Sequence, residues 1–217
     1  MPTRSTRPHP RHPRRTQAER RAETQTRLLD VTIKSLAKRG YAGMSTNDVV
    51  RGAGVSRGAL VHHYPTKAKL AVAALDRWLE ARLLQFEQEF TALAPDAQRA
   101  DTAIDVLWGI FSEPTYAAVL ELYVAARTDP ELRESLVEVN QRFQEGVTST
   151  FHRTFPTAEA GAAFDPEIAV RFAFTVLSGA VLNTVILGPD APNPPEAVVS
   201  LKALAGLLVN DPWRTTP

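Results

Sequence analysis

Apolar residues recur at intervals of three and four along most of this 217-residue chain, and no stretch alternates as a strand would. A first helix is expected from about Thr16 to Arg39, with Gly40 as its stop. Its apolar stripe consists of Leu29, Ile33, Leu36 and Ala37. A second long helix is expected from Thr66 to about Leu93, and its apolar side carries Leu75, Leu79, Phe86 and Phe90.

Between these two helices, the segment from Ser45 to Lys67 predicts two short helices joined by a glycine turn. Ser45 or Thr46 can cap the first of them, and Asp48 is placed to reach back as a capping-box acid. Gly54 can take the left-handed conformation that ends a helix, and Ser56 can then cap the second helix. This pattern is typical of a helix-turn-helix.

The second short helix has one inward and one outward side. Residues four apart share a face, so Leu60 and Tyr64 form a row that is expected to look inward. The other rows pair Arg57 with Val61 and Gly58 with His62, which suits close approach to base edges in a major groove. Helix-turn-helix geometry also occurs in proteins that never touch DNA, and this alternative stays open.

Charge is distributed unevenly along the chain. The formal net charge is +1, but residues 1–73 carry 15 Lys and Arg against 4 Asp and Glu, whereas residues 74–217 carry 10 against 20. A basic N-terminal part is the electrostatic footprint of a phosphate-binding surface. Residues 1–15, rich in arginine and proline, are expected to be a disordered basic arm that either adds DNA contacts or only aids solubility.

The N-terminal part also resembles a known family. The run from Gly40-Tyr41 through Ser45-Thr46, Asp48-Val49, Ala53-Gly54-Val55-Ser56, Gly58, Leu60, His63-Tyr64 and Lys67 to Leu70 resembles the DNA-binding domain of the TetR family of bacterial transcriptional regulators. The resemblance implies a dimeric, all-helical repressor that responds to a ligand.

Carried over position by position, the resemblance assigns DNA contacts to several residues. Thr46 and Asn47 would meet DNA from the first helix of the motif, and His63 and Lys67 would hold phosphates. The residues that would face the groove are Arg57, Gly58, Ala59, Val61 and His62. Val61 departs from the family, because most members have a tyrosine there, so a phosphate hydrogen bond is exchanged for possible contact with a thymine methyl.

The rest of the chain predicts further helices. They are expected at about Asp101 to Phe111, Pro114 to Thr128, Pro130 to Phe155, Asp165 to Leu187 and Pro195 to Val209. The fold class is therefore all-α, with a small helix-turn-helix domain (residues 16–70) joined by a long helix to a larger ligand-binding and dimerisation domain (residues 71–217). We expect the long helix after Thr66 to be the lever between the two.

Aromatic and polar residues of the C-terminal half are candidates for an effector pocket, since ELYVAARTDPEL (121–132) also resembles TetR-type regulators. The candidates are Trp108, Phe111, Tyr116, Tyr123, Arg127, Phe143 and Phe174. Core packing is the more common role for each of the aromatic residues taken singly, because aromatics at helical spacing usually belong to the interior. For Arg127 the simpler role is a salt bridge to Glu121 or Glu131.

The nearly continuous apolar segment Ile168–Leu187 predicts close helix packing rather than a membrane span, because it contains Arg171 and Asn183. With the last helix it could form a four-helix interface across a two-fold axis, or else an intramolecular core. The candidate interface residues are Val176, Gly179, Ala180, Asn183, Leu201, Leu204 and Leu208.

Other function classes find little support in the sequence. There is no cysteine, no Gly-rich phosphate loop, no HExxH and no GxSxG, so neither an enzyme nor a metal site is expected. No cofactor is expected beyond a small-molecule effector of unknown identity. The expected partners are an operator in double-stranded DNA, a second copy of the chain and the effector, in the cytoplasm and without a membrane. The alternative is a helical interaction module whose basic end binds some other polyanion.

Overall fold

The computed structural model describes residues 16–92, 99–154, 166–192 and 195–209, and the predicted basic arm lies outside these residues. Within them the chain is helical apart from its turns, as the sequence predicts. The first four helices are α1 (Gln17–Gly43), α2 (Thr46–Ala53), α3 (Arg57–His63) and α4 (Lys67–Thr91). They are followed by α5 (Arg99–Phe111), α6 (Tyr116–Ala126), α7 (Pro130–Thr154), α8 (Pro166–Leu187), the short 3-10 helix η2 (Gly188–Asp190) and α9 (Glu196–Val209).

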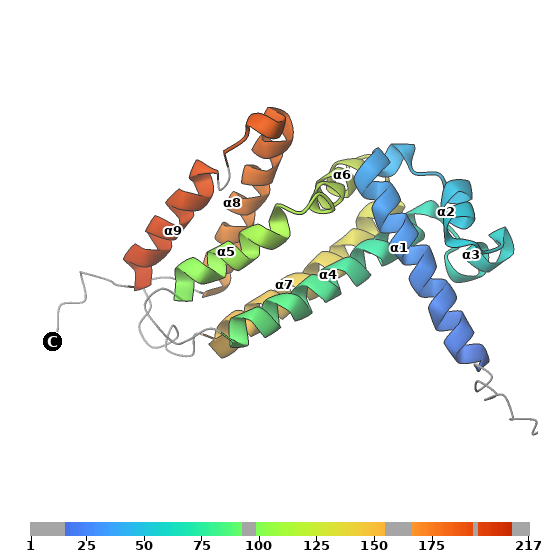
Figure 1. Cartoon of the computed structure of the whole chain (residues 1–217), viewed down its shortest axis with the longest axis horizontal. Coiled ribbons are helices and arrows are strands. Elements are labelled where there is room, and N and C mark those ends of the chain that lie inside the picture. Colours follow the sequence, from blue (N-terminus) through green and yellow to red (C-terminus); the bar gives the residue numbers. More distant parts are fainter. Residues whose placement is uncertain (1–15, 93–98, 155–165, 193–194, 210–217) are drawn as a thin grey trace, which may run out of the picture.

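The helix-turn-helix lies at one end of an elongated molecule, and α8 and α9 lie at the other (Figure 1). From α3 the chain turns directly into α4, which crosses most of the distance between these ends. Thr66 caps α4 by accepting a hydrogen bond from the N–H of Lys69 at 3.2 Å, as predicted. The long helix therefore begins at the DNA-binding motif and ends in the C-terminal domain.

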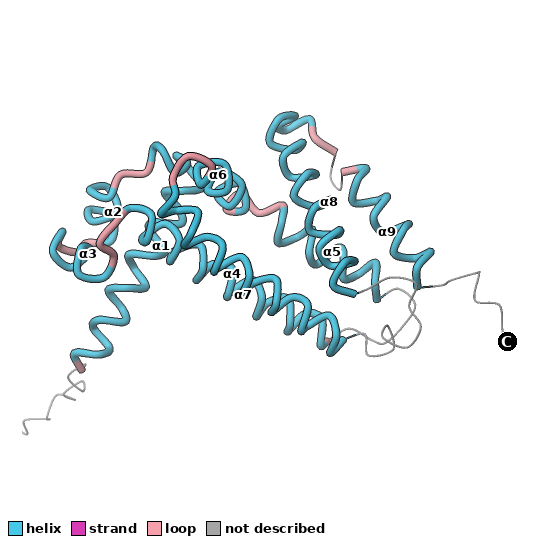
Figure 2. Tube along the Cα trace, turned by 180° about the vertical axis from the view of Figure 1, so that it is seen from behind, coloured by secondary structure: helices cyan, strands magenta, loops and turns pink. Residues whose placement is uncertain are grey.

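Helices α4 and α7 lie side by side and run in the same direction. Near the start of the pair Arg142 forms an ion pair with Asp76 at 2.7 Å, and further along Arg153 pairs with Glu87 at 2.6 Å. The view from behind shows the two helices side by side along their whole length, with α5, α8 and α9 grouped beyond them (Figure 2). Helix α6 packs against α1 of the N-terminal domain as well as against α7 and α8.

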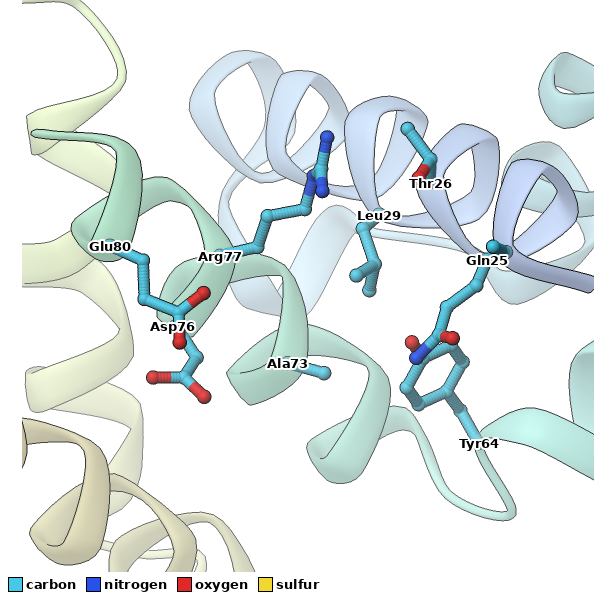
Figure 3. Close-up of a pocket in the computed structure, with 9 residues that line it drawn as sticks. Gln25, Thr26, Leu29, Tyr64, Ala73, Asp76, Arg77 and Glu80 are labelled. Atoms are coloured by element: carbon cyan, nitrogen blue, oxygen red, sulfur yellow. The ribbon is translucent and has the colours of Figure 1, made fainter. Parts of the chain in front are cut away.

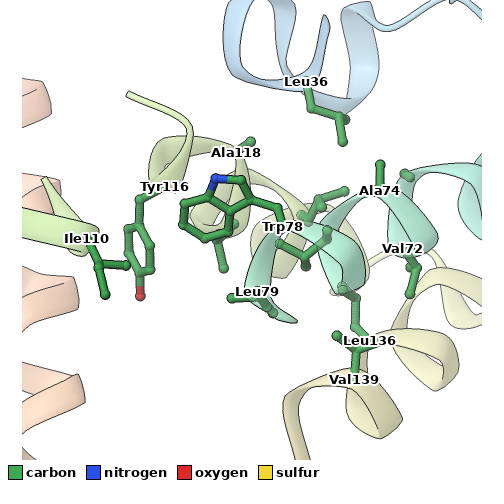
Figure 4. Packing of buried hydrophobic residues seen from close by; sticks show 14 of the residues in the cluster. Leu36, Val72, Ala74, Trp78, Leu79, Ile110, Tyr116, Ala118, Leu136 and Val139 are labelled. Carbon is green, nitrogen blue, oxygen red and sulfur yellow. The ribbon is translucent and has the colours of Figure 1, made fainter. Parts of the chain in front are cut away.

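The core runs without interruption from the helix-turn-helix domain into the C-terminal domain. Trp78 of α4 lies at its centre, with Leu36 of α1 on one side, Ala118 of α6 beside it, and Leu136 and Val139 of α7 below (Figure 4). All of these side chains are buried. Since the two domains share one core, the position of the helix-turn-helix depends on the packing of α4 and α6.

Helix α1 continues four residues beyond Arg39, its predicted end. Gly40 has φ 66° and ψ 176°, so the helical geometry breaks at this glycine, but helical turns resume as far as Gly43. The other predicted glycine turn is confirmed, because Gly54 adopts the left-handed conformation at the end of α2.

Candidate nucleic-acid interface

The N-terminus of α3 is fixed by its cap. Ser56 Oγ accepts a hydrogen bond from the N–H of Ala59 at 3.1 Å, as predicted. Leu60 and Tyr64 are buried in the core, and Tyr64 lies between α1 and α4, which sets the rotation of the helix. Consequently Arg57, Gly58, Val61 and His62 are exposed on the opposite side, and Ala59 is half-buried between them.

The N-termini of α2 and α3 meet on this exposed side. Arg57 Nη1 donates to Oδ1 of Asn47 at 3.5 Å, a long hydrogen bond that brings the two predicted DNA-contacting residues together. Asn47 is exposed, and Thr46, the first residue of α2, is half-buried. The structure therefore gathers these residues with the outward row of α3 on one surface.

Asp48 has a role that the sequence reading missed. It was expected to cap α2, but Ser45 makes no capping hydrogen bond through its side chain, and the carboxylate of Asp48 binds two arginines instead. Arg39 of α1 donates to it at 2.6 Å, and Arg51 of α2 donates to its other oxygen. The carboxylate thus ties the end of α1 to α2 and is neutralised close to the predicted DNA-binding surface, because both arginines supply full positive charges.

The structure makes both predicted phosphate-binding residues weaker cations than a free histidine and lysine. Burial, helped by nearby Arg21 and by His62, lowers the pKa of His63, so the free protein presents a neutral imidazole at pH 7. The ammonium of Lys67 donates to the carbonyl of Ala42 at 3.2 Å and lies 4.7 Å from the ring centre of Tyr41. Burial also lowers the pKa of Lys67. A phosphate would therefore have to share this ammonium with the turn after α1.

Four of the seven predicted pocket residues converge in one aromatic cluster. The ring centres of Phe111 and Tyr116 are 4.4 Å apart, those of Phe111 and Phe174 are 5.0 Å apart, and those of Phe143 and Phe174 are 5.7 Å apart. Trp108 is buried in the same core. The cluster draws on α5, α6, α7 and α8, so any change in its packing reaches all four helices.

Two of the predicted aromatic residues, Tyr116 and Tyr123, form hydrogen bonds with polar residues that the sequence did not predict as part of a pocket. Tyr116 Oη and Ser178 Oγ share a hydrogen bond of 2.9 Å, and Tyr123 donates to Oδ1 of Asn140 at the same distance. Burial raises the pKa of Tyr116, so its phenol stays protonated, whereas Tyr123 is 42% exposed. Neither Ser178 nor Asn140 is among the pocket residues predicted from the sequence.

Arg127 lies outside the aromatic cluster and is exposed. The expected salt bridge to Glu121 or Glu131 does not form among the residues that the structure describes. The carboxylate of Glu121 accepts from the backbone N–H of Tyr41, and that of Glu131 accepts from the hydroxyl of Thr66. Both acids on this side of α6 and α7 are therefore directed toward the DNA-binding domain.

A groove of about 380 Å³ lies between α1 and α4, away from the aromatic cluster (Figure 3). Tyr64 and Gln25 lie together at one end of it, and Asp76, Arg77 and Glu80 project from α4 at the other. Two of these charges are already paired, since Asp76 binds Arg142 at 2.7 Å and Arg77 lies 3.5 Å from Asp30. The groove therefore shows no preference for a ligand of one charge.

The predicted interface residues divide between the two sides of α8 and α9. Ala180 and Leu201 are buried inside the chain, and Val176 is half-buried. Gly179, Asn183 and Leu204 are exposed, while the side chain of Leu208 lies outside the described residues. The intramolecular core and an uncovered face thus coexist on the same helices.

The uncovered face of α8 forms a continuous stripe at helical spacing. This α8 stripe consists of Ile168, Phe172, Thr175, Gly179, Leu182 and Ile186, all exposed. By length and composition, Glu167–Leu187 could cross a membrane, and 22% of its most apolar window is buried inside the protein. Val199 and Leu204 of the neighbouring α9 are exposed as well. An exposed apolar surface of this kind marks a contact site for another protein or a membrane.

Comparison with known proteins covers both domains. Residues 28–74 match the model for bacterial regulatory proteins of the tetR family, and residues 94–209 match the model for the tetracyclin repressor-like C-terminal domain. The chain is 32% identical to an uncharacterized HTH-type transcriptional regulator of Mycobacterium tuberculosis over 173 residues, which cover 80% of this chain and 88% of that protein. It is 38% identical to the HTH-type transcriptional regulator CymR of Pseudomonas putida over 130 residues, 59% of this chain and 64% of CymR.

Solved structures share the fold at low sequence identity. A Rhodococcus sp. protein assigned to the TetR family superposes with a TM-score of 0.71 at 20% identity, covering 87% of this chain and 99% of that one. FadR from Bacillus subtilis, solved in complex with stearoyl-CoA, superposes with a TM-score of 0.64 at 16% identity, covering 85% of this chain and 97% of FadR.

Proposed function

The chain belongs to the TetR family of bacterial regulatory proteins and is a DNA-binding transcriptional regulator, and we propose that it acts as a homodimeric repressor, released from a palindromic operator by a small-molecule effector. The observation that carries the proposal is the exposed row of α3, in which Arg57 stands at a capped helix N-terminus beside Asn47. Such a row offers a bidentate donor and small residues to base edges in the major groove.

Dimerisation is supported by the α8 stripe. Its apolar residues, together with Val199 and Leu204 of α9, would leave water when a second copy covers them, and burial of apolar area drives such association. Two helices from each protomer would then form a four-helix interface. The stripe lies at the end of the molecule remote from α3, so both recognition helices stay free (Figure 1).

Response to an effector is supported by the aromatic cluster and its protonated phenols. Tyr116 and Tyr123 could donate hydrogen bonds to a mostly apolar molecule, with Ser178 and Asn140 as further polar groups. The structural neighbour FadR was solved with stearoyl-CoA, so a chain of this fold can hold a small molecule. An effector lowers operator affinity only to the extent that it binds one conformation better than the other.

The proposal is tested with the purified full chain and a pool of duplexes from which the best binder is selected. Fluorescence anisotropy then compares the selected palindrome with its scrambled version at several salt concentrations. Strong preference for the palindrome with two protomers per site is expected. Equal and steeply salt-dependent binding to both duplexes would overturn it and would favour a polyanion-binding module.

A further inference from the structure

Three carboxylates of the C-terminal domain hold the DNA-binding domain. Glu121 of α6 accepts from the N–H of Tyr41, Asp129 accepts from the hydroxyl of Tyr41 at 3.1 Å, and Glu131 accepts from the hydroxyl of Thr66 at 2.8 Å. We propose that Glu121 is a positioning residue that sets the operator half-site spacing by fixing the orientation of the helix-turn-helix on the C-terminal domain. This inference rests on the proposed dimeric operator binding.

The contact of Glu121 is built into the break in α1. At Gly40 the backbone leaves helical geometry, and the next N–H, that of Tyr41, donates to Oε2 of Glu121 at 3.2 Å. A Cβ at position 40 would lie only 1.8 Å from this oxygen, so the approach requires glycine. The glycine thus makes room for the acid and also redirects the amide that binds it.

The second point of attachment lies directly behind the recognition helix. Thr66, which binds Glu131, caps α4 two residues after Tyr64 ends α3. Lys67 ties the same turn back to the end of α1 through the carbonyl of Ala42 and the ring of Tyr41. The end of α1 and the turn from α3 to α4 are therefore attached to α6 and α7 as one unit.

Glu121 differs from the other two acids in having no local role among the described residues. Asp129 also accepts from the N–H of Leu132 at 3.0 Å and so starts α7, and the partner of Glu131 is itself the cap of α4. The contact of Glu121 crosses the domain boundary, between residues 80 positions apart. Its removal should loosen the attachment without unmaking a helix in either domain.

The orientation of the helix-turn-helix on the C-terminal domain determines which distance between operator half-sites the dimer can bind. In a two-fold dimer, any rotation of the helix-turn-helix occurs in both protomers. The displacements of the two recognition helices therefore add, and the distance between the helices changes by twice the displacement of one. That distance must match about 34–36 Å for successive major grooves, whereas one added base pair shifts a half-site by about 3.4 Å. A firmly held motif therefore rejects a duplex with one base pair added or removed, and a loosened motif tolerates it.

The test uses the full chain, the selected palindrome and two versions with one central base pair added or removed. Wild type should prefer the selected spacing strongly, and Glu121→Ala should bind all three duplexes with similar affinity. Glu121→Gln should behave as wild type, because its amide oxygen still accepts from the N–H of Tyr41. Glu134→Ala, at an exposed position of α7, removes the same charge and should leave the spacing preference intact.

An unchanged spacing ratio in Glu121→Ala overturns the proposal, even if overall affinity falls. Hydrogen exchange of the Tyr41 amide provides a readout that needs no DNA: it should accelerate in Glu121→Ala and not in Glu134→Ala, and unchanged protection also overturns the proposal. If wild type itself shows no preference for a palindrome, the proposed function fails, an outcome distinguishable from a failure confined to Glu121.

Discussion

Arg57 is the first residue of α3, and its guanidinium extends from the capped turn to Asn47 across the surface that we assign to DNA. Arginine reads guanine through two parallel hydrogen bonds, so Arg57→Ala should cost about 1–3 kcal/mol on the operator. Scrambled DNA, which attracts the protein through phosphate charge, should lose less. Anisotropy titrations of both duplexes measure the difference, and equal losses would show that Arg57 does not read bases.

Lys67 is the phosphate-contacting residue with which the base-reading role of Arg57 can be compared. Its ammonium is anchored by Ala42 and Tyr41 at the turn behind α3, and a lysine contacts phosphate as a point charge without regard to sequence. Lys67→Ala should therefore weaken binding to operator and scrambled DNA together. Selective loss of operator binding in this variant would transfer base reading away from Arg57.

Tyr41 makes stability depend on alkaline pH. Burial and the neighbouring Asp129 and Glu131 raise its pKa to about 12, above its usual value near 10. Because the folded state holds this proton more tightly, the stabilisation is fully present below pH 10 and is lost as pH rises from 10 toward 12. Urea unfolding across this range should show a smaller loss in Tyr41→Phe than in wild type. Identical pH profiles would show that the phenol is not linked to folding.

At the scale of elements, local signals predicted most helix starts. Ser56 and Thr66 cap α3 and α4 as expected, and Gly54 ends α2 in the left-handed conformation. Helix periodicity also predicted which side of α3 is buried. These features depend on residues within one turn of each other, which is the range over which sequence determines backbone conformation most directly.

Local sequence signals did not predict the contacts between helices. Asp48 has the spacing of a capping acid, yet its carboxylate binds Arg39 and Arg51. Ion pairs with two arginines are stronger than a hydrogen bond to one amide. The docking of α6 on α1, and with it the role of Glu121, joins residues far apart in the chain. The long α4 was expected to be the lever, and α6 is a second connection that periodicity could not indicate.

The break in α1 gives a prediction at this scale. Gly40 combines φ 66° with ψ 176°, a region that residues with a Cβ occupy only at a cost of about 1–3 kcal/mol, and an added methyl would also displace the flexible carboxylate of Glu121 from the N–H of Tyr41. Gly40→Ala should therefore lower the free energy of unfolding in urea. Adding Glu121→Ala should recover little of this loss, because the backbone strain remains. A single variant within about 0.5 kcal/mol of wild type would contradict both causes.

At the scale of the whole molecule, function is divided between the two ends. The basic first third of the chain carries the proposed DNA-facing surface, and the acidic remainder carries the α8 stripe. An acidic domain repels phosphate, so it keeps DNA on the motif and leaves the far end free for another partner. A monomer would engage a single half-site, whereas two linked motifs bind the second half-site at high effective concentration.

In the proposed dimer, the α8 stripe would control operator affinity from a distance. Ile186 is 73% exposed, and Ile186→Glu would place a charge in the apolar interface at no cost to the isolated protomer. Sedimentation velocity should show a monomer with unchanged helix content, and operator affinity should fall by about 10²–10⁴. Val124→Glu, at a similarly exposed apolar position on α6, is the control and should stay dimeric with full affinity. A variant at Ile186 that remains dimeric would remove the stripe from the interface, and a monomer that keeps full operator affinity would show that the two motifs do not act together.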